Sequence, residues 1–176
     1  MSIKEASWHN SKIFPKIQNS KWSRPPRLRR FAGPRSKSVT MPCWARRFQI
    51  YPNLNEETYI EDVLNMMQRG YKMAGVFESE ENGAMHEMRA IGVVGVRVIR
   101  KLSFGKILEI EDFMIDRARR GIGVGKMLIK WVEYQAAVFG CKMIIGDLDS
   151  KRLESHKIYS REKFILEGFH FRKNCD

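Results

Sequence analysis

A glycine-rich segment, residues 116–126, lies where a β-rich stretch gives way to a helical one. Gly121, Gly123 and Gly125 occupy alternate positions within it. Glycine lets the backbone approach a ligand, and the first N–H groups of a helix point outward at the positive end of its dipole. The pattern therefore predicts a strand and a helix joined by a loop that cradles a phosphate group. Three basic side chains beside the loop add charge: Arg119, Arg120 and Lys126.

Two common phosphate-binding motifs do not fit this segment. A Walker loop would need glycine at Arg120 and serine or threonine at Met127. The dinucleotide pattern G-x-G-x-x-G would need its third glycine at Lys126, although Asp147 stands where a ribose-binding acid would be. A tight turn with a solvated basic rim is the structural alternative, but three glycines exceed what such a turn needs.

Hydrophobic periodicity predicts alternating strands and helices from residue 45 onward. In the first helix Asn55 is a suitable N-cap, apolar residues recur at helical spacing, and Gly70 ends the pattern. The expected order is β-α-β-β-β-α-β-α-β, with one or two final strands, and the fold class is α/β, or α+β. Strands are expected at 48–50, 72–78, 88–102, 106–116, 143–148 and within 164–173, and helices at about 55–70, from the glycine loop to 139, and at 153–163.

Composition excludes several other classes of protein. The chain is 43% hydrophobic and 30% charged, which is an ordinary globular balance. Its longest apolar run, residues 90–96, is far shorter than the ~20 residues of a membrane-spanning helix, so we expect no membrane segment. The 3 cysteines are far apart and the 4 histidines form no H-x-x-x-H pair, which excludes a disulfide scaffold and predicts no metal centre.

The net charge of +12 belongs almost entirely to the N-terminal stretch. Residues 1–47 carry +11, whereas residues 48–176 carry +1. Residues 1–44 hold five of the six prolines and no hydrophobic period, which predicts a mostly unstructured extension before a domain over residues 45–176. The alternatives are an arm for nucleic acid or another acidic partner, a targeting segment, or a stretch upstream of a true start at Met41.

The loop and the segments after it resemble the GNAT superfamily of N-acetyltransferases. Arg120-x-x-Gly123-x-Gly125 has the R/Q-x-x-G-x-G/A form of the acyl-CoA pyrophosphate loop in that family. Residues 155–164 are similar to its A-H-x-F-Y-x-x-x-G-F segment. Residues 148–150 and 168–171 fit the same family, whereas Ser155, Lys163 and Arg152 depart from its usual alanine, glycine and asparagine.

The resemblance implies a central mixed, mostly antiparallel sheet flanked by helices, with the fourth and fifth strands splayed around acyl-CoA. Acetyl-CoA is then the co-substrate, an amine is the acceptor, no metal is required, and the protein is cytoplasmic and compatible with a homodimer. The implied contacts with the pantetheine arm come from the backbone of Phe113, Met114 and Ile115. The implied pyrophosphate contacts come from Arg120, Gly121, Ile122, Gly123, Val124, Gly125 and Lys126.

Three residues are candidates for proton transfer. Tyr159 matches the family's tyrosine near the thioester sulfur and would protonate the leaving thiolate, although it also suits a core aromatic position. Glu109 and Glu111 alternate with Phe113 along the fourth strand, so we expect the two carboxylates on the same face as Phe113. Either could take the proton from the amine, and each could raise the pKa of the other. The alternatives are a water chain in place of a glutamate base, and an exposed pair of carboxylates without a catalytic role. His156 is more often a structural residue in such a helix than a proton shuttle.

The acceptor is the least determined feature of the sequence. Acidic residues around the first helix and the second hairpin would suit a cationic amine, but a helix N-terminus and a polar turn explain them equally well. These acids are Glu56, Glu57, Glu61, Asp62, Glu78, Glu80, Glu81 and Glu87. Small-molecule and protein amines both stay open, as do transfer of a longer acyl chain, an acyl-CoA-binding module without turnover, and nucleic-acid binding through the N-terminal tail.

Overall fold

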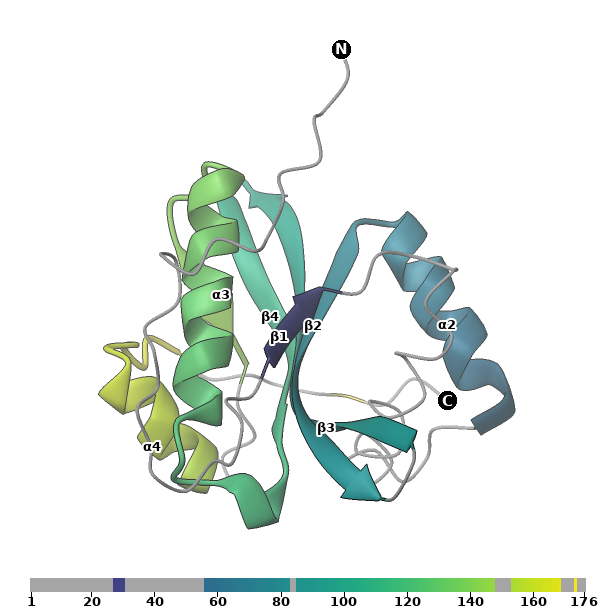
Figure 1. Cartoon of the computed structure of the whole chain (residues 1–176). Helices are drawn as coiled ribbons and strands as arrows, with labels where there is room; N and C mark the ends of the chain where they lie inside the picture. The colour runs from purple at the N-terminus through teal and green to yellow at the C-terminus, as the bar shows by residue number, and fades with distance from the viewer. Residues whose placement is uncertain (1–26, 31–55, 83–84, 148–152, 169–172, 174–176) are drawn as a thin grey trace.

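The computed structural model describes residues 27–30, 56–82, 85–147, 153–168 and 173 of the chain (Figure 1). The strands are β1 (Arg27–Arg30), β2 (Tyr71–Asn82), β3 (Met85–Lys101), β4 (Gly105–Ile115) and β5 (Ile144–Gly146). The helices are α2 (Glu56–Gln68), the short 3-10 helix η2 (Arg117–Arg119), α3 (Val124–Val138) and α4 (Leu153–Arg161). Within the described residues, no helix is long and apolar enough to cross a membrane.

The strands form one five-stranded sheet in the order β1-β2-β3-β4-β5. The first three pairings are antiparallel, and β5 joins β4 in parallel after the α3 crossover. Parallel neighbours need such a crossover, because a tight hairpin can only reverse the chain. The expected mixed, mostly antiparallel sheet flanked by helices is therefore confirmed.

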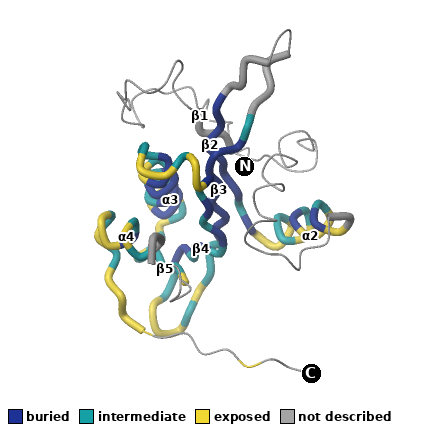
Figure 2. Tube along the Cα trace, turned by 90° about the horizontal axis from the view of Figure 1, so that it is seen from below, coloured by how far each residue is buried: buried dark blue, intermediate teal, exposed yellow. Residues whose placement is uncertain are grey.

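Helices cover both faces of the sheet (Figure 1), and each face has its own apolar core. The core on the α3 face includes Trp131 and Leu128 of α3 and Tyr159 of α4. The core on the other face includes Tyr59 and Val63 of α2. Figure 2 shows that burial is concentrated along the central strands and the side of α3 that faces them. The middle of the sheet is thus closely packed on both faces.

The predicted positions of the long elements are confirmed. The helix expected at about 55–70 is α2, the strands expected at 88–102 and 106–116 are β3 and β4, and the helix after the glycine loop is α3. Each boundary agrees to within about three residues. The turn expected at 80–83 is partly wrong, because β2 runs on to Asn82, which pairs with Met85 of β3. Backbone hydrogen bonds to a neighbouring strand extend the strand through polar residues that carry no hydrophobic signal.

The expected final strand is not found in its described part. Residues 164–168 follow α4 without joining the sheet, and Ile165 and Leu166 are strongly exposed. The apolar run of residues 164–166 is compatible with a strand, but a strand requires a partner as well as apolar residues. The strand expected at 48–50 lies outside the described residues.

The N-terminal stretch supplies a strand that its composition did not predict. Arg27–Arg30 forms β1 at the edge of the sheet, antiparallel to β2, with Arg27 opposite Phe77 and Arg30 opposite Ala74. Residues 1–44 were expected to be mostly unstructured, and these four residues are a strand within that stretch. Strand pairing uses backbone N–H and C=O groups, so a basic, proline-flanked segment can still occupy a sheet edge. The boundary expected at residues 44 and 45 falls outside the described residues.

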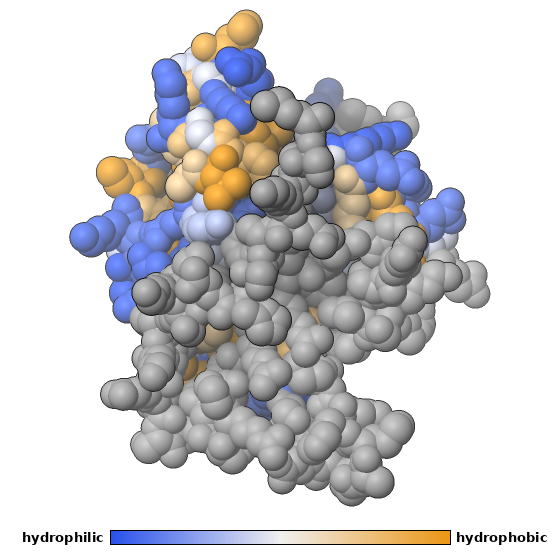
Figure 3. Space-filling view, turned by 45° about the horizontal axis from the view of Figure 1, so that its top comes forward, coloured by the Kyte–Doolittle hydropathy of each residue, from blue (hydrophilic) through white to orange (hydrophobic). Residues whose placement is uncertain are grey.

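The glycine loop and the β3–β4 hairpin lie at opposite ends of α3 (Figure 1). The exposed apolar side chains of the hairpin end are Leu102 and Phe104, and Val138 is exposed near the C-terminus of α3. Figure 3 views this end and shows apolar side chains interspersed with polar ones. The functional elements predicted from the sequence are at the other end, around the first turn of α3.

Candidate active site

Strands β4 and β5 are paired over only three residues. Leu108 pairs with Ile144 and Ile110 pairs with Gly146, and β4 then continues to Ile115. Beyond the pair of Ile110 and Gly146, the described part of β5 offers no partner to β4. The described β5 ends at that pair while β4 continues, so the backbone of residues 113–115 lies in a part of β4 without a described β5 partner, which we call the divergent part.

The backbone of this part of β4 has N–H groups available to a ligand. The Asp116 N–H donates to the Ile91 carbonyl of β3 at 2.9 Å. Successive N–H groups of a strand point to opposite sides, so the N–H groups of Phe113 and Ile115 point away from β3. They point to the β5 side of β4, where no described strand residue pairs with them, and we call this side the gap. Met114, with its N–H toward β3, contributes a buried side chain to the α2 core.

A β-bulge at Glu111 changes which side chains share a face. Asp112 pairs with Gly95 and Ile110 pairs with Val96, so Glu111 has no directly opposed residue on β3. An extra residue on one strand shifts the alternation of side chains beyond it. The bulge was not visible in the sequence, because it depends on how β3 and β4 are aligned.

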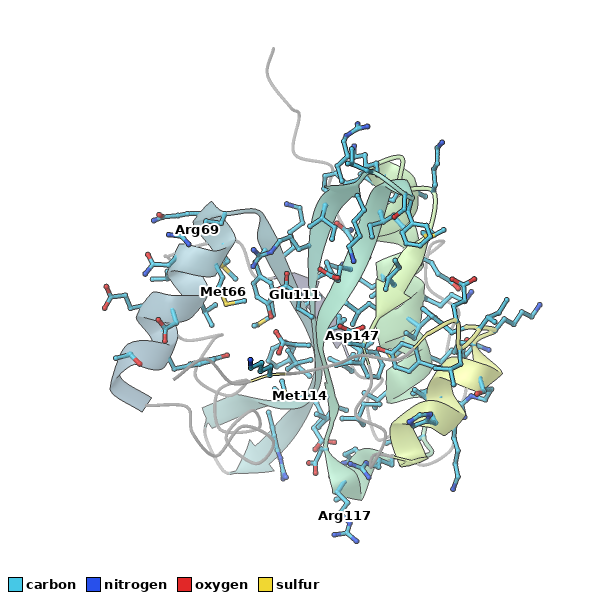
Figure 4. All side chains as sticks on the ribbon, turned by 180° about the vertical axis from the view of Figure 1, so that it is seen from behind. Met66, Arg69, Glu111, Met114, Arg117 and Asp147 are labelled. Carbon is cyan, nitrogen blue, oxygen red and sulfur yellow. The ribbon has the colours of Figure 1, made fainter. Side chains whose placement is uncertain are left out.

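The expectation that Glu109, Glu111 and Phe113 share one face is therefore wrong. Arg97 is opposite both Tyr71 of the α2 core and Glu109, and residues opposite one another in antiparallel strands share a face. Glu109 and Glu111 consequently lie on the α2 face, where Figure 4 shows Glu111 together with Met66 and Arg69 of α2. Phe113 packs against the core on the α3 face.

Both glutamates form ion pairs with β3. Arg97 Nε lies 2.6 Å from Glu111 Oε1, and Lys101 Nζ lies 3.4 Å from Glu109 Oε1. The glutamate side chains are partly buried. Burial raises the pKa of Glu111 above its usual value, Arg97 opposes that rise, and the charges of Asp112 and Glu109 add to it. The expected influence of one carboxylate on the other thus has the right direction for Glu111.

Tyr159 lies at the point where β4 and β5 stop pairing, on the face opposite the glutamates. A Cβ atom on Gly146 would lie 3.2 Å from the Tyr159 hydroxyl oxygen, so the hydroxyl is directly beside the last paired residue of β5. The tyrosine is 5% exposed and its ring contacts Phe113 and Phe164 edge to face. Burial raises the pKa of Tyr159, and the Asp147 charge adds to the rise. The phenol is therefore protonated throughout the physiological pH range.

The glycine loop has the geometry of an anion-binding helix start. Gly121 and Gly123 have φ angles of 78° and 94°, a left-handed region that other residues rarely adopt. Gly123 is the N-cap of α3 and has no side chain that could cap the helix. Because the Met127 N–H donates to the Gly123 carbonyl at 3.1 Å, the N–H groups of the three residues between them have no acceptor in the helix. Those groups suit a pyrophosphate.

Gly125 has a packing role as well. A Cβ atom there would lie 1.9 Å from Ile158 Cδ1 of α4 and 2.9 Å from Ile115 Cδ1 of β4. Glycine at this position lets α3, α4 and β4 meet closely. The ligand role that we expected for Gly125 therefore has a structural requirement beside it, since any larger residue would separate these elements.

The basic residues of the loop divide into two kinds. Arg119 is held by Glu78 of β2 through a 2.9 Å ion pair, and Arg89 of β3 holds Asp116 at 3.1 Å. These two pairs tie η2 to the sheet and were not expected from the sequence. Arg120 is exposed and forms no ion pair within the described part of the chain, and the same holds for Lys126. Arg120 and Lys126 are therefore the cations available to a phosphate.

The remaining candidates are placed less centrally. Glu78 forms an ion pair with Arg119, whereas Glu61 and Asp62 of α2 are exposed. His156 lies one turn before Tyr159, and its buried Nε2 has no hydrogen-bond partner among the described residues. Among the described residues, no three His, Cys, Asp or Glu side chains gather closely enough to hold a metal ion. The side chains of Glu56, Glu57, Glu80, Glu81 and Glu87 lie outside the described set.

Comparison with solved structures finds the same fold in other acetyltransferases. The aminoglycoside acetyltransferase AAC(6')-Iy, in complex with the bisubstrate analogue CoA-S-monomethyl-acetylneamine, superposes with a TM-score of 0.68 at 18% identity, covering 86% of this chain and 100% of that one. AAC(6')-Ih from Acinetobacter baumannii gives 0.67 at 15% identity, with the same coverage. An acetyltransferase from Trypanosoma brucei gives 0.65 at 19% identity, again with 86% and 100% coverage. No curated protein sequence matches the chain.

The sequence itself matches a family model over most of its length. The model described as the acetyltransferase (GNAT) family matches residues 43–164. This range includes the glycine loop, the divergent part of β4 and Tyr159. The chain therefore belongs to the acetyltransferase (GNAT) family and is an acetyl-CoA-dependent N-acetyltransferase.

Proposed function

We propose that the protein transfers the acetyl group of acetyl-CoA to a primary amine, with Glu111 as the general base and Tyr159 as the general acid. One observation carries this proposal. The pairing of β4 and β5 ends at Ile110 and Gly146, and the two proton-transfer candidates lie on opposite faces of the sheet at that point. A thioester entering between the diverging strands from the α3 face would meet an amine arriving from the α2 face.

The binding of acetyl-CoA is assigned to backbone groups. The pyrophosphate would be held by the N–H groups of Ile122 to Lys126 at the start of α3, with Arg120 supplying charge. The pantetheine arm would pair with the outward N–H groups of Phe113 and Ile115. A backbone N–H of this strand would also stabilise the oxyanion that develops on the thioester carbonyl.

The base is needed because an amine attacks only in its neutral form. In the reaction the amine nitrogen bonds to the carbonyl carbon, the carbon–sulfur bond breaks, and one amine proton must leave. Glu111 is the first residue of β4 beyond the last pair with β5, and its pKa is raised by burial. Both features favour Glu111 over Glu109, which lies in the paired part of β4 beside Lys101. The proton from the amine would then pass from Glu111 to solvent.

The acid is needed because the bond to sulfur releases a thiolate. The Tyr159 hydroxyl lies beside Gly146 at the divergence and carries its proton at neutral pH. Donation of that proton would convert the thiolate into free CoA, and solvent would then restore the phenol.

The acceptor that the site favours is a cationic small-molecule amine. Glu109 and Glu111 place two carboxylates on the α2 face of β4, although Lys101 and Arg97 pair with them, and a cationic amine could take the place of Arg97 beside Glu111. Several proteins with the same fold are aminoglycoside acetyltransferases, which supports an amine of this class. Protein amines are the second candidate, because the same chemistry serves a lysine side chain or an N-terminus.

Release of free thiol from acetyl-CoA tests the proposal directly. The panel of acceptors should include neamine, sisomicin, spermidine, free lysine and a lysine-containing peptide. We expect turnover with at least one cationic amine and a large loss in the Glu111→Gln variant. The matched control is Glu133→Gln, which removes a carboxylate from the outer side of α3, where Glu133 pairs with Lys130 at 2.6 Å. Binding of acetyl-CoA without turnover across the panel would instead favour a binding module.

A further inference from the structure

Tyr71 and Asp112 form a buried link between two strands that are not neighbours. The Tyr71 hydroxyl of β2 donates a hydrogen bond to Asp112 Oδ2 of β4, although β3 lies between those strands. Tyr71 is 2% exposed and Asp112 is 5% exposed. A carboxylate is rarely buried so deeply without a function or a specific partner, because removal of its charge from water is costly.

Gly95 of β3 makes this link sterically possible. It is directly opposite Asp112 in the sheet, and a Cβ atom on it would lie 1.8 Å from the Tyr71 hydroxyl oxygen. The φ angle of Gly95 is not in the left-handed region, so the backbone does not require glycine there. The tyrosine ring does, because it passes over β3 at that residue.

The link ends at the bulge that presents Glu111. Asp112 is the residue after Glu111, and the break in register falls between Gly95, which pairs with Asp112, and Val96, which pairs with Ile110. Arg97, which forms the ion pair with Glu111, is the β3 residue directly opposite Tyr71 of β2. Tyr71 is thus connected to Glu111 in two ways, through Asp112 along β4 and through Arg97 across β3.

We propose that Tyr71 and Asp112 are positioning residues for Glu111: they lock the β4 bulge and place a fixed negative charge beside Glu111, which offsets the charge of Arg97. This inference rests on the proposed role of Glu111 as the base. Asp112 does not need to touch either substrate for this role. Its charge favours a proton on Glu111, so that this carboxylate can accept one from the amine rather than stay locked in its ion pair.

Several charged groups surround Glu111 on this face. Arg97 and Lys101 come from β3, and Glu109 and Asp112 come from β4. Arg69 is on the facing helix α2 but is exposed (Figure 4). Arg97 lowers the pKa of Glu111, whereas Asp112 and Glu109 raise it. Removal of the Asp112 charge alone therefore leaves Arg97 less opposed, and the pKa of Glu111 should fall.

The decisive measurement is a carboxyl ¹³C NMR titration of the full chain without substrates, in which Glu111 is identified by the signal missing from Glu111→Gln. Asp112→Asn keeps an oxygen that can accept from Tyr71 but loses the charge, and we expect the Glu111 midpoint to move to lower pH. The matched control, Glu133→Gln, should leave that midpoint in place. An unchanged midpoint in Asp112→Asn would overturn the proposal.

Two further variants test the geometric half of the proposal. Tyr71→Phe removes only the hydroxyl, and Gly95→Ala places a methyl group where that hydroxyl lies. With an amine that the parent acetylates, we expect both variants to lower kcat by about 10-fold and to leave the Kd for acetyl-CoA unchanged. This loss is smaller than the ~10²-fold or more that one general base contributes, because Glu111 itself is retained. Parent kcat in Tyr71→Phe would contradict the positioning role. Absence of any turnover in the parent would refute the proposed function instead, and the NMR titration would still decide on Asp112.

Discussion

The Tyr159 hydroxyl and the Cα of Gly146 lie against each other where β5 leaves β4. A side chain on Gly146 would stand 3.1 Å from the tyrosine ring and 3.2 Å from its hydroxyl oxygen. Gly146 therefore has two roles. It forms the last β4–β5 pair, with Ile110, and its lack of a side chain leaves room for the buried phenol. The hydroxyl of the candidate acid, Tyr159, thus lies beside Gly146, the residue at which β4 and β5 stop pairing.

Substitution of Tyr159 by phenylalanine tests the acid. The Tyr159→Phe variant keeps the ring contacts with Phe113 and Phe164 but has no proton to donate. We expect kcat to fall by about 10²-fold, the low end of the range for general acid catalysis, because a phenol is a weak acid for a thiolate. Acetyl-CoA affinity, measured by calorimetry, should be unchanged. If Tyr159→Phe turned over at the parent rate while chemistry was rate-limiting, Tyr159 would have only a packing role.

A carboxylate in the glycine loop tests the phosphate cradle. Gly123→Asp places negative charge at the N-cap of α3 and should weaken acetyl-CoA binding by about 10-fold or more, because it competes with the pyrophosphate for the same N–H groups. Gly140→Asp is the matched control. Gly140 also has a positive φ, 62°, but follows the opposite end of α3. Equal weakening by the two variants would mean that backbone strain, not the cradle, explains the effect.

The pH dependence of kcat/KM tests which glutamate is the base. A base must be deprotonated, so the rate should fall as the pH drops through the pKa of Glu111, which burial raises above the ordinary value. This acidic limb should disappear in Glu111→Gln and persist in Glu109→Gln. The reverse pattern would assign the base to Glu109, and a limb present in both variants would favour a water chain.

Ligand-induced stabilisation tests the choice of nucleotide. Acetyl-CoA at about 100 times its Kd should stabilise the fold by about 2.7 kcal/mol through mass action. A thermal-shift comparison with NAD and ATP at equal concentration should show a smaller effect, because the loop lacks the third glycine of the dinucleotide motif and the Walker serine or threonine. Equal stabilisation by NAD would contradict the assignment of the loop to acyl-CoA.

Truncation at Met41 tests the role of β1. Its removal uncovers the edge of β2 over four residues. Loss of about two to four backbone hydrogen bonds at about 0.5–1.5 kcal/mol each should lower the free energy of unfolding by about 1–6 kcal/mol. A chain that begins at Arg24 retains β1 and is the control. Denaturant unfolding of both chains decides, and equal stability of the two would show that β1 contributes nothing.

The sequence by itself determined the features that depend on short stretches of chain. The glycines of the loop, the helical spacing in α2 and α3 and the Val- and Ile-rich runs of β3 and β4 are local signals, because each reflects the conformations open to a few adjacent residues. The family and the position of Tyr159 followed from the same short motifs.

Only the tertiary structure decided what depends on alignment between distant strands. The bulge at Glu111 puts Glu111 and Phe113 on opposite faces of the sheet. Arg27–Arg30 joins the sheet as β1, and the Tyr71 hydroxyl reaches Asp112 across Gly95. None of these has a local signature, because pairing through backbone groups constrains the side chains only weakly. Register is set when the whole sheet packs between its two cores, and that packing placed the candidate acid and base on opposite sides of one gap.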